Sequence, residues 1–325
     1  MNVKKIFSPR ILLCLIILVV MTVFVIGSDV YVDSVKSGLT LYVACVLPAT
    51  FPFFFFSKLL TELNFAGDLT GLTEKPMKKL FRAPPIGGYV LIMSLLCGYP
   101  IGAKLLSEFC SHGLITEEEA KRISAFTSTG GPIFIIGTVG VAMFDNKTYG
   151  FILLLSHYIG TFLNGIVFRG KKRSVSSFSL PDLKNEDVLQ KSMTETFLSI
   201  GVVGGFIVLF NLIVDMIDHT NLFAPFVRLL SLLKIPSRLS EAFLFGLIEM
   251  TRGCKMLSAL SYPVYVLLPC CAFLLTFGGS SVSFQSLTYL AKIKISPAYY
   301  LLTKITQGIF SAIIAFLLSC LLILL

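Results

Sequence analysis

Long apolar runs without charged residues recur along the whole chain and are separated by short polar segments. A membrane-spanning helix needs about 20 predominantly apolar residues, and several of the runs reach or approach that length. The pattern therefore predicts an all-α polytopic membrane protein. The runs cover residues 11–27, 39–57, 83–103, 123–144, 149–168, 196–214, 256–291 and 305–325.

The second part of the chain repeats landmarks of the first part in the same order. The Gly-x-Lys sequence at 102–104 recurs at 253–255, an offset of 151 residues, and Pro85 pairs with Pro236 at the same offset. The glycine pair at 130–131 recurs at 278–279, an offset of 148, which also relates Gly160 to Gly308. Four landmarks in one order, with nearly equal offsets, indicate an internal duplication.

Each half is predicted to contain a spanning helix, an amphipathic segment at the membrane surface, a helical hairpin, a helix broken at a glycine pair, and a final span. The expected elements are 39–60, 76–85, 86–112, 118–144 and 148–168 in the first half. They are 195–217, 225–236, 239–260, 264–290 and 299–325 in the second half.

Each hairpin is expected to re-enter the membrane from its own side, so that a half has three crossings. An odd number of crossings makes the second repeat inverted in the membrane, as in many secondary transporters. With one extra N-terminal transmembrane helix, expected to remain as an uncleaved anchor, the chain has seven crossings. The expected divisions are an N-terminal transmembrane anchor at 1–37, a first repeat at 38–169, a cytoplasmic linker at 170–194 and a second, inverted repeat at 195–325.

Basic residues are distributed unequally between the segments that this arrangement places on opposite sides. Seventeen Lys and Arg residues fall on one side, and only five fall on the other. The positive-inside rule then predicts a multi-pass cell-membrane protein with a cytoplasmic N-terminus and an extracytoplasmic C-terminus. The five basic residues on the outer side are Lys36, Lys147, Arg228, Lys234 and Arg238.

The composition agrees with a membrane protein and excludes other classes. Charged residues make up 14% and hydrophobic residues 55% of the 325 residues, against about 25% and 45–50% in soluble domains. The net charge of +9 comes mainly from residues between apolar runs, which indicates membrane orientation rather than nucleic-acid binding. No nucleophile elbow, zinc-protease, P-loop or paired-carboxylate motif occurs, so no enzymatic activity is expected. The eight cysteines lack metal-ligand spacing, and neither a metal site nor a cofactor is predicted.

Polar residues gather at the predicted helix breaks. Irregular backbone is tolerated at membrane depth only where it is buried in protein or lines a cavity, and half-helix ends present free N–H or C=O groups to a ligand. The breaks therefore predict one polar cavity near the midplane for a small polar solute or a coupling Na⁺ or H⁺. The alternative is that these small residues only allow close helix packing. The candidates are Tyr99, Ser128, Thr129, Gly130, Gly131, Thr251, Gly278, Gly279, Ser280, Ser281, Ser283 and Gln285.

Glu249 and Arg252 complete the candidate set. An ionisable group at membrane depth is costly and marks a candidate functional site. Because Arg252 follows three residues after Glu249, the two side chains could share a helix face as a structural ion pair. The other interpretation makes Glu249 a substrate or proton site. Asp215 and His219 are expected to be solvated near a helix end.

Several motifs resemble those of the YlbJ family of sporulation integral membrane proteins. They are F-P-F-F at 51–54, G-Y-P-I-G-A-K at 98–104, E-E-E-A-K-R at 117–122, G-G-P-I-F-I-I-G at 130–137 and F-G-G-S-S-V at 277–282. The resemblance extends over residues 39–325 and places the chain among gate-domain, or nucleoside-recognition, membrane proteins. It implies a role in spore formation in a Gram-positive endospore former.

The order of elements also looks like that of the concentrative nucleoside transporters, in which both hairpin tips and both unwound helices line the substrate site. Glu249 matches the acidic residue of their second hairpin, whereas Tyr99 stands where they have a polar, acidic cluster. The resemblance implies a transporter of an unidentified small polar solute. A non-transporting membrane protein for spore envelope or cortex assembly and an ion-coupled sensor are the alternatives. The expected partners are the lipid bilayer and the solute, and no nucleic acid is expected. Whether the chain forms a homo-oligomer is left undecided by the sequence.

Overall fold

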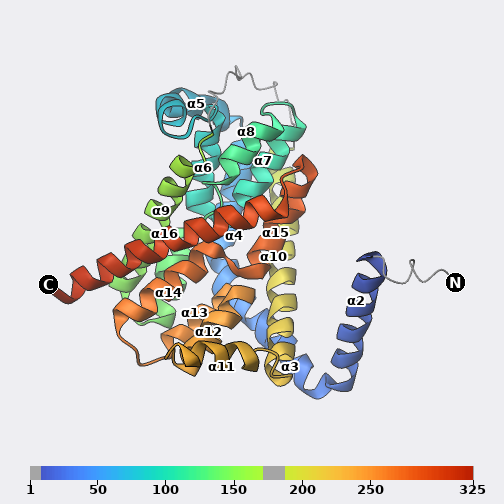
Figure 1. Ribbon diagram of the computed structural model, residues 1–325. Helices are drawn as coiled ribbons and strands as arrows, with labels where there is room; N and C mark the ends of the chain where they lie inside the picture. The colour runs from blue at the N-terminus through green and yellow to red at the C-terminus, as the bar shows by residue number, and fades with distance from the viewer. Residues whose placement is uncertain (1–8, 171–186, 325) are drawn as a thin grey trace.

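The computed structural model describes residues 9–170 and 187–324, and within these ranges the chain is helical throughout, without a strand (Figure 1). Most of the predicted linker and the first eight residues, including Lys4 and Lys5, lie outside the described residues. The all-α class predicted from the apolar runs is confirmed for the part of the chain that the structure describes.

The first half contains the predicted elements in the predicted order. A continuous helical segment consists of α3, a π-helical stretch η1, and α4, and two surface elements and a hairpin follow it. The next helix is interrupted by a non-helical stretch before a π-helical element, η3. The bounds are α2 (Pro9–Ile26), α3 (Ser28–Leu41), η1 (Tyr42–Val46), α4 (Leu47–Glu62), α5 (Phe65–Pro76), η2 (Met77–Phe81), α6 (Ile86–Cys97), α7 (Ile101–Ser111), α8 (Glu117–Ser124), η3 (Ile133–Met143) and α9 (Lys147–Val167).

The second half runs through the same series. A long helix, α10, leads to a short surface helix, a hairpin, a helix broken at the glycine pair, and a final helix. The bounds are α10 (Val188–His219), α11 (Ala224–Leu232), α12 (Ser237–Ile248), α13 (Met250–Ser258), α14 (Val264–Phe277), α15 (Gly279–Leu290), η4 (Ala291–Ile293) and α16 (Pro297–Leu324).

Local sequence signals set several helix starts. Thr116 begins α8 with a capping box: its hydroxyl accepts from the Glu119 amide at 3.2 Å, and the Glu119 carboxylate accepts from the Thr116 amide at 2.9 Å. This pair satisfies two backbone donors that would otherwise lack partners. Asn146 begins α9 in a similar way, since its Oδ1 accepts from the Tyr149 amide at 3.2 Å.

Five helices are long and apolar enough to cross a membrane: Ser28–Glu62, Lys147–Val167, Val188–His219, Val264–Ile293 and Pro297–Leu324. The two other predicted crossings correspond to shorter apolar helices, Arg10–Ile26 and Ile133–Met143. The pair Phe65–Phe81 and Ile86–Cys97 is bent by 92° and would give a sixth span if it were counted as one. The chain is thus a multi-pass membrane protein, and the total of seven crossings stays a prediction.

Two predicted boundaries fall inside helices. The division between residues 37 and 38 lies within the continuous helix Ser28–Glu62, because Tyr42–Val46 changes the helix type without interrupting it. The second-half helix starts at Val188, inside the predicted linker 170–194. Both helices extend beyond their uncharged runs, since polar residues can continue a helix outside the hydrocarbon region.

The two hairpins approach the centre of the molecule from opposite ends (Figure 1). The hairpin α6–α7 lies with α5 and α8 at the end where α10 begins, and α12–α13 lies with α11 at the end where α10 terminates. The final helices of the two halves, α9 and α16, cross closely: a Cβ atom added at Gly160 would lie 2.9 Å from the Ser311 amide nitrogen. Small residues allow such close helix crossings in membranes.

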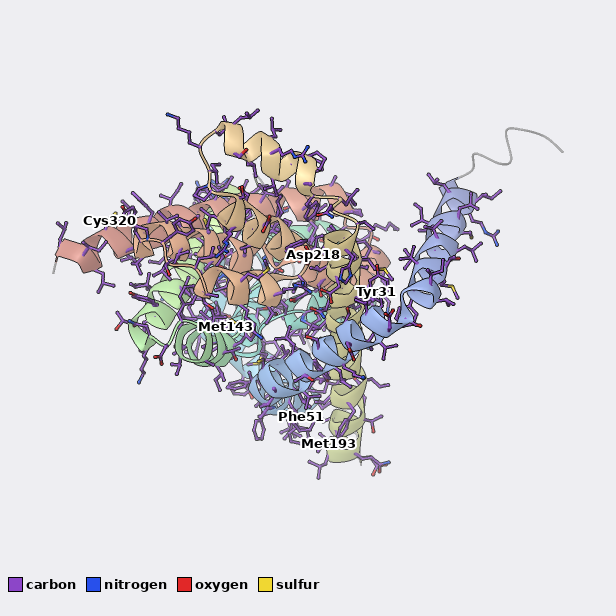
Figure 2. All side chains as sticks on the ribbon, turned by 90° about the horizontal axis from the view of Figure 1, so that it is seen from below. Tyr31, Phe51, Met143, Met193, Asp218 and Cys320 are labelled. Atoms are coloured by element: carbon purple, nitrogen blue, oxygen red, sulfur yellow. The ribbon has the colours of Figure 1, made fainter. Side chains whose placement is uncertain are left out.

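The N-terminal helix α2 stands beside the body of the molecule (Figures 1 and 2). Its contacts with α3 and α10 form a small apolar cluster around Tyr31, Leu212 and Met216. Most other side chains of α2 are exposed, for example Leu12 at 59% and Val19 at 61%. Large apolar side chains on the outer faces of α10 and α16 are also exposed, which is the surface that lipid contact favours.

A methyl group at Gly102 should destabilise the fold, because its Cβ atom would lie 1.8 Å from the Thr127 carbonyl oxygen, a backbone atom that cannot rotate away. We expect Gly102→Ala to lower the free energy of unfolding by about 1–3 kcal/mol. Thermal unfolding in detergent, followed by a thiol-reactive fluorophore that labels buried cysteines as they become exposed, measures this change. Gly201→Ala is the matched control, since nothing lies within 4 Å of its added Cβ atom. Equal stability of the two variants would contradict the close packing of Gly102 against the Thr127 carbonyl.

Candidate functional site

The tip of the first hairpin packs directly on the break of the first half. Gly98 has a φ of +86°, and a Cβ atom there would lie 2.6 Å from the Gly131 amide nitrogen. The backbone around Gly130 and Gly131 is non-helical. Only glycine combines this positive φ with such a close approach of two backbone segments.

The second half is built in the same way. A Cβ atom at Gly279 would lie 3.0 Å from the carbonyl oxygen of Ile248, at the tip of the hairpin α12–α13. The chain is extended at Glu249, where α12 ends and α13 begins. Each hairpin tip therefore contacts the glycine pair of its own half.

A small cavity lies where the two tips and the two breaks meet. Its volume is about 40 Å³, measured as the space open to the centre of a water molecule, which exceeds the roughly 10–15 Å³ that one water requires. Helices α4 and α10 close its sides. The lining residues are Val46, Thr50, Cys97, Gly98, Tyr99, Gly130, Gly131, Phe134, Val203, Ile207, Glu249, Met250, Thr251, Ser281, Val282 and Gln285.

Seven of the fourteen predicted site residues line this cavity, namely Tyr99, Gly130, Gly131, Glu249, Thr251, Ser281 and Gln285. Others bond within the surrounding wall: the Thr129 hydroxyl donates to the Ser94 carbonyl at 2.6 Å, the Ser280 hydroxyl donates to the Leu247 carbonyl at 3.3 Å, and the Ser128 hydroxyl lies 3.0 Å from that of Tyr300. Gly278 and Gly279 form the turn between α14 and α15. Ser283 is buried, and its hydroxyl oxygen has no hydrogen-bond partner.

Among the described residues that line the cavity, Glu249 alone carries a carboxylate, and it is 1% exposed. One carboxylate oxygen accepts from the Arg252 backbone amide at 2.7 Å, so that Glu249 caps α13. A negative charge at a helix N-terminus is stabilised by the free amides and by the helix dipole. The cap fixes the carboxylate at the cavity wall.

The side-chain ion pair with Arg252, one of the two interpretations of Glu249, is absent among the residues that the structure describes. The Arg252 guanidinium instead pairs with Asp215 on α10 and lies 3.9 Å from Asp218. Asp215 is therefore an ion-pair partner and not a solvated residue, as the sequence interpretation had it. The spacing of three residues brings the Arg252 backbone amide to Glu249, whereas the longer guanidinium reaches the neighbouring helix.

Behind the cavity wall lies a buried polar network that the sequence analysis missed. The Lys304 ammonium donates to the Tyr99 hydroxyl, the Ser128 carbonyl and the Gln307 side-chain oxygen at 2.9–3.1 Å. His157 accepts from the Gly130 amide through Nε2 at 2.9 Å and lies 2.8 Å from the Thr276 hydroxyl through Nδ1. Lys304 was overlooked because it immediately precedes an uncharged run. The available signal was the similarity of L-L-S-H at 154–157 to L-L-T-K at 301–304, an offset of 147 residues that places Lys304 opposite His157.

A surface cleft of about 840 Å³ lies next to one end of the cavity. Cys45 and Arg252 line the cleft, whereas their chain neighbours Val46 and Thr251 line the cavity. The cleft thus approaches the cavity along η1 and along the tip of α13. Its lining residues are Ser37, Thr40, Leu41, Ala44, Cys45, Asn211, Asp215, Arg252, Lys255, Met256 and Ala259.

The opposite end is occupied by ion pairs between α4, α7 and α10. The Lys58 ammonium, 7% exposed, lies 2.7 Å from Glu62, 3.1 Å from Glu108 and 3.0 Å from Glu195. Lys104 extends the cluster to Glu195 at 3.4 Å, and Lys191 extends it to Glu62 at 2.8 Å. We call these six residues the ion-pair cluster. It holds three helices together at this end of the cavity.

Double-mutant cycles can test whether the Arg252 side chain pairs with Asp215 and not with Glu249. We expect Arg252→Gln and Asp215→Asn to be non-additive, with a coupling of about 0.5–3 kcal/mol, because either change removes the same ion pair. Glu249→Gln and Arg252→Gln should show a smaller coupling, since the amide oxygen of Gln can still accept from the backbone of residue 252. Thermal unfolding of the single and double variants gives both values. If the coupling between Glu249 and Arg252 were larger than that between Arg252 and Asp215, the ion-pair interpretation of Glu249 would be supported.

Comparison with known proteins identifies one relevant relative. The chain is 29% identical over 313 residues to the sporulation integral membrane protein YlbJ of Bacillus subtilis (strain 168), which covers 88% of this chain and 77% of that protein. No family model matches the chain, and no solved structure matches it. The similarity along nearly the whole length confirms the resemblance to the YlbJ family of sporulation integral membrane proteins that the motifs indicate.

Proposed function

We propose that the chain is a transporter of a small polar solute that acts during spore formation, with the cavity at the two hairpin tips as its solute site. The observation that carries this proposal is the buried carboxylate of Glu249 in a cavity lined by both hairpin tips, by the first helix break and by α15, which follows the second break. Ionisable groups at membrane depth typically belong to solute or ion pathways. The role in spore formation follows from the name of the relative.

A path through the molecule supports transport. Along the first long helix, Cys45 lies in the cleft, Thr50 in the cavity and Lys58 in the ion-pair cluster. Along α10, Asp215 lies in the cleft, Ile207 in the cavity and Ser199 beside the cluster. The same two helices therefore follow one route from the cleft to the cluster. The conformation fits a state that is open toward the cleft and closed at the cluster.

The proposal includes two inverted repeats. Its support is that each hairpin tip contacts the glycine pair of its own half, while the two hairpins come from opposite ends of the molecule (Figure 1). Alternating access in such proteins exposes one fixed site to either side in turn. We also propose that the chain shares the scaffold of the concentrative nucleoside transporters. It differs from them at the tip of the first hairpin, where Tyr99 replaces their polar, acidic cluster.

The lining limits the chemistry of the solute. Glu249, Gln285, Ser281 and Thr251 offer oxygen acceptors and one carboxylate, which favours a solute with hydrogen-bond donors or a positive charge. The volume of about 40 Å³ accommodates a few waters or an ion, so that a larger solute requires the hairpins to separate. Purified protein in liposomes, assayed with nucleosides, peptidoglycan precursors and cations, tests for uptake directly.

Side-specific labelling should reveal the path. In a variant in which Cys45 is the sole cysteine, a membrane-impermeant thiol reagent should react from the extracytoplasmic side. A sole cysteine at Ser57, beside the ion-pair cluster, should react slowly from either side, because the cluster closes that end. Glu195→Gln should raise its labelling from the cytoplasmic side several-fold by weakening the cluster. Glu74→Gln, which alters the exposed pair with Lys78, is the control. Labelling of Cys45 only from the cytoplasmic side would contradict the path.

Glu249→Gln should abolish function without loss of protein. The exchange keeps the helix cap and removes the charge that faces the solute. The measurement is the yield of heat-resistant spores in a Bacillus subtilis strain that lacks YlbJ and is complemented by this chain. Glu241→Gln, at a half-buried carboxylate on α12 that does not line the cavity, should behave like the wild type. Normal spore yield with Glu249→Gln, together with no uptake into liposomes, would favour a non-transporting role in spore envelope assembly.

A further inference from the structure

The ammonium group of Lys304 donates hydrogen bonds to three oxygen atoms. Lys304 is 1% exposed on α16. The acceptors are the Ser128 carbonyl at 2.9 Å, the Gln307 side-chain oxygen at 3.0 Å and the Tyr99 hydroxyl at 3.1 Å. The ammonium also lies 4.8 Å from the centre of the Tyr99 ring. These contacts come from three separate parts of the chain.

No carboxylate pairs with this ammonium among the residues that the structure describes. The nearby ring of His157 is neutral, because its Nε2 accepts from the Gly130 amide and its hydrogen is therefore on Nδ1, which donates to the Thr276 hydroxyl. Tyr99 and Tyr300 are the other titratable groups beside it. The positive charge is thus stabilised by oxygen dipoles alone. Burial of a charge without an opposite charge costs free energy, which indicates that the charge has a role at this position.

The acceptors are ordered to face a cation. Gln307 is fixed by its amide, which donates to the Thr161 hydroxyl at 2.7 Å and to the Ser128 carbonyl at 3.3 Å, so that its oxygen points to Lys304. The Tyr99 hydroxyl donates to the Leu275 and Thr276 carbonyls at 3.1 and 3.0 Å. The last carbonyls of a helix lack partners and carry partial negative charge. The network therefore joins the exposed carbonyls of both breaks around one positive charge.

Carbonyl, amide and hydroxyl oxygens are the kinds of ligand that monovalent metal ions take in membrane proteins. We propose that Lys304 is a tethered cation: its ammonium occupies an oxygen site of the kind that binds a sodium or potassium ion, and it replaces that ion in holding the two breaks together. The site is distinct from the solute cavity, from which it is separated by the side chain of Tyr99.

One consequence rests on the proposed function. A carrier whose oxygen site is filled by its own lysine needs no metal ion there. The metal-replacement proposal itself holds whether or not the protein transports a solute.

Lys304→Ser tests the proposal, because it removes the ammonium and leaves the surrounding oxygens with a small hydroxyl. The thermal unfolding midpoint is measured in sodium, potassium and choline chloride at equal ionic strength. We expect the wild type to unfold at the same temperature in all three salts. The variant should be destabilised in choline and should recover at least half of that loss in sodium or potassium, with a midpoint that rises with the logarithm of the metal concentration.

Two results would overturn the proposal: equal midpoints of Lys304→Ser in all three salts, or a wild type that gains as much from sodium or potassium as the variant does. Lys191→Ser, which removes a half-exposed lysine of the ion-pair cluster, is the control and should show no specific response to sodium or potassium. Where Lys304→Ser does not accumulate, Lys304→Gln replaces it, and its purified yield must rise when sodium or potassium replaces choline. An unchanged yield counts against the proposal. None of these results depends on solute uptake.

Discussion

The need to satisfy backbone groups at two helix breaks inside the membrane governs the centre of this protein. An unpaired N–H or C=O group in a hydrocarbon environment costs several kcal/mol. In the first break, His157 accepts from the Gly130 amide, and Lys304 donates to the Ser128 carbonyl. In the second, Tyr99 donates to the last carbonyls of α14. The partners come mostly from the opposite half or from the final helices, so the breaks tie the two halves together.

This constraint also determines where a ligand can be bound. The hairpin tips must approach the breaks closely enough to exclude lipid, and the glycines at 98 and 279 permit that approach. What remains open between the tips is a small cavity with one buried carboxylate. The carboxylate of Glu249 is held by the backbone amide of Arg252 in the first turn of α13 and not by an ion pair with a basic side chain of the described residues.

Besides Glu249, basic side chains lie at three separate places along the part of the chain that the structure describes. Arg252 pairs with Asp215 beside the cleft, Lys58 lies among three carboxylates at the other end, and Lys304 lies among neutral oxygens at the centre. The two ends are held by ion pairs between helices, whereas the central lysine contacts the first break through the Ser128 carbonyl and is linked to the second break through the Tyr99 hydroxyl.

The sequence by itself determined the helical class, the order of the elements, both hairpins and both breaks, because apolar runs, prolines and glycine pairs act locally. It also identified Glu249, since a carboxylate within an apolar hairpin is visible without coordinates. Only the tertiary structure decided the partners. A spacing of three residues allowed an Arg252–Glu249 pair as one interpretation, but the guanidinium reaches Asp215, 37 residues earlier on a neighbouring helix. Lys304 and Tyr99 are 205 residues apart, and no local pattern specifies a contact that depends on how two helices cross.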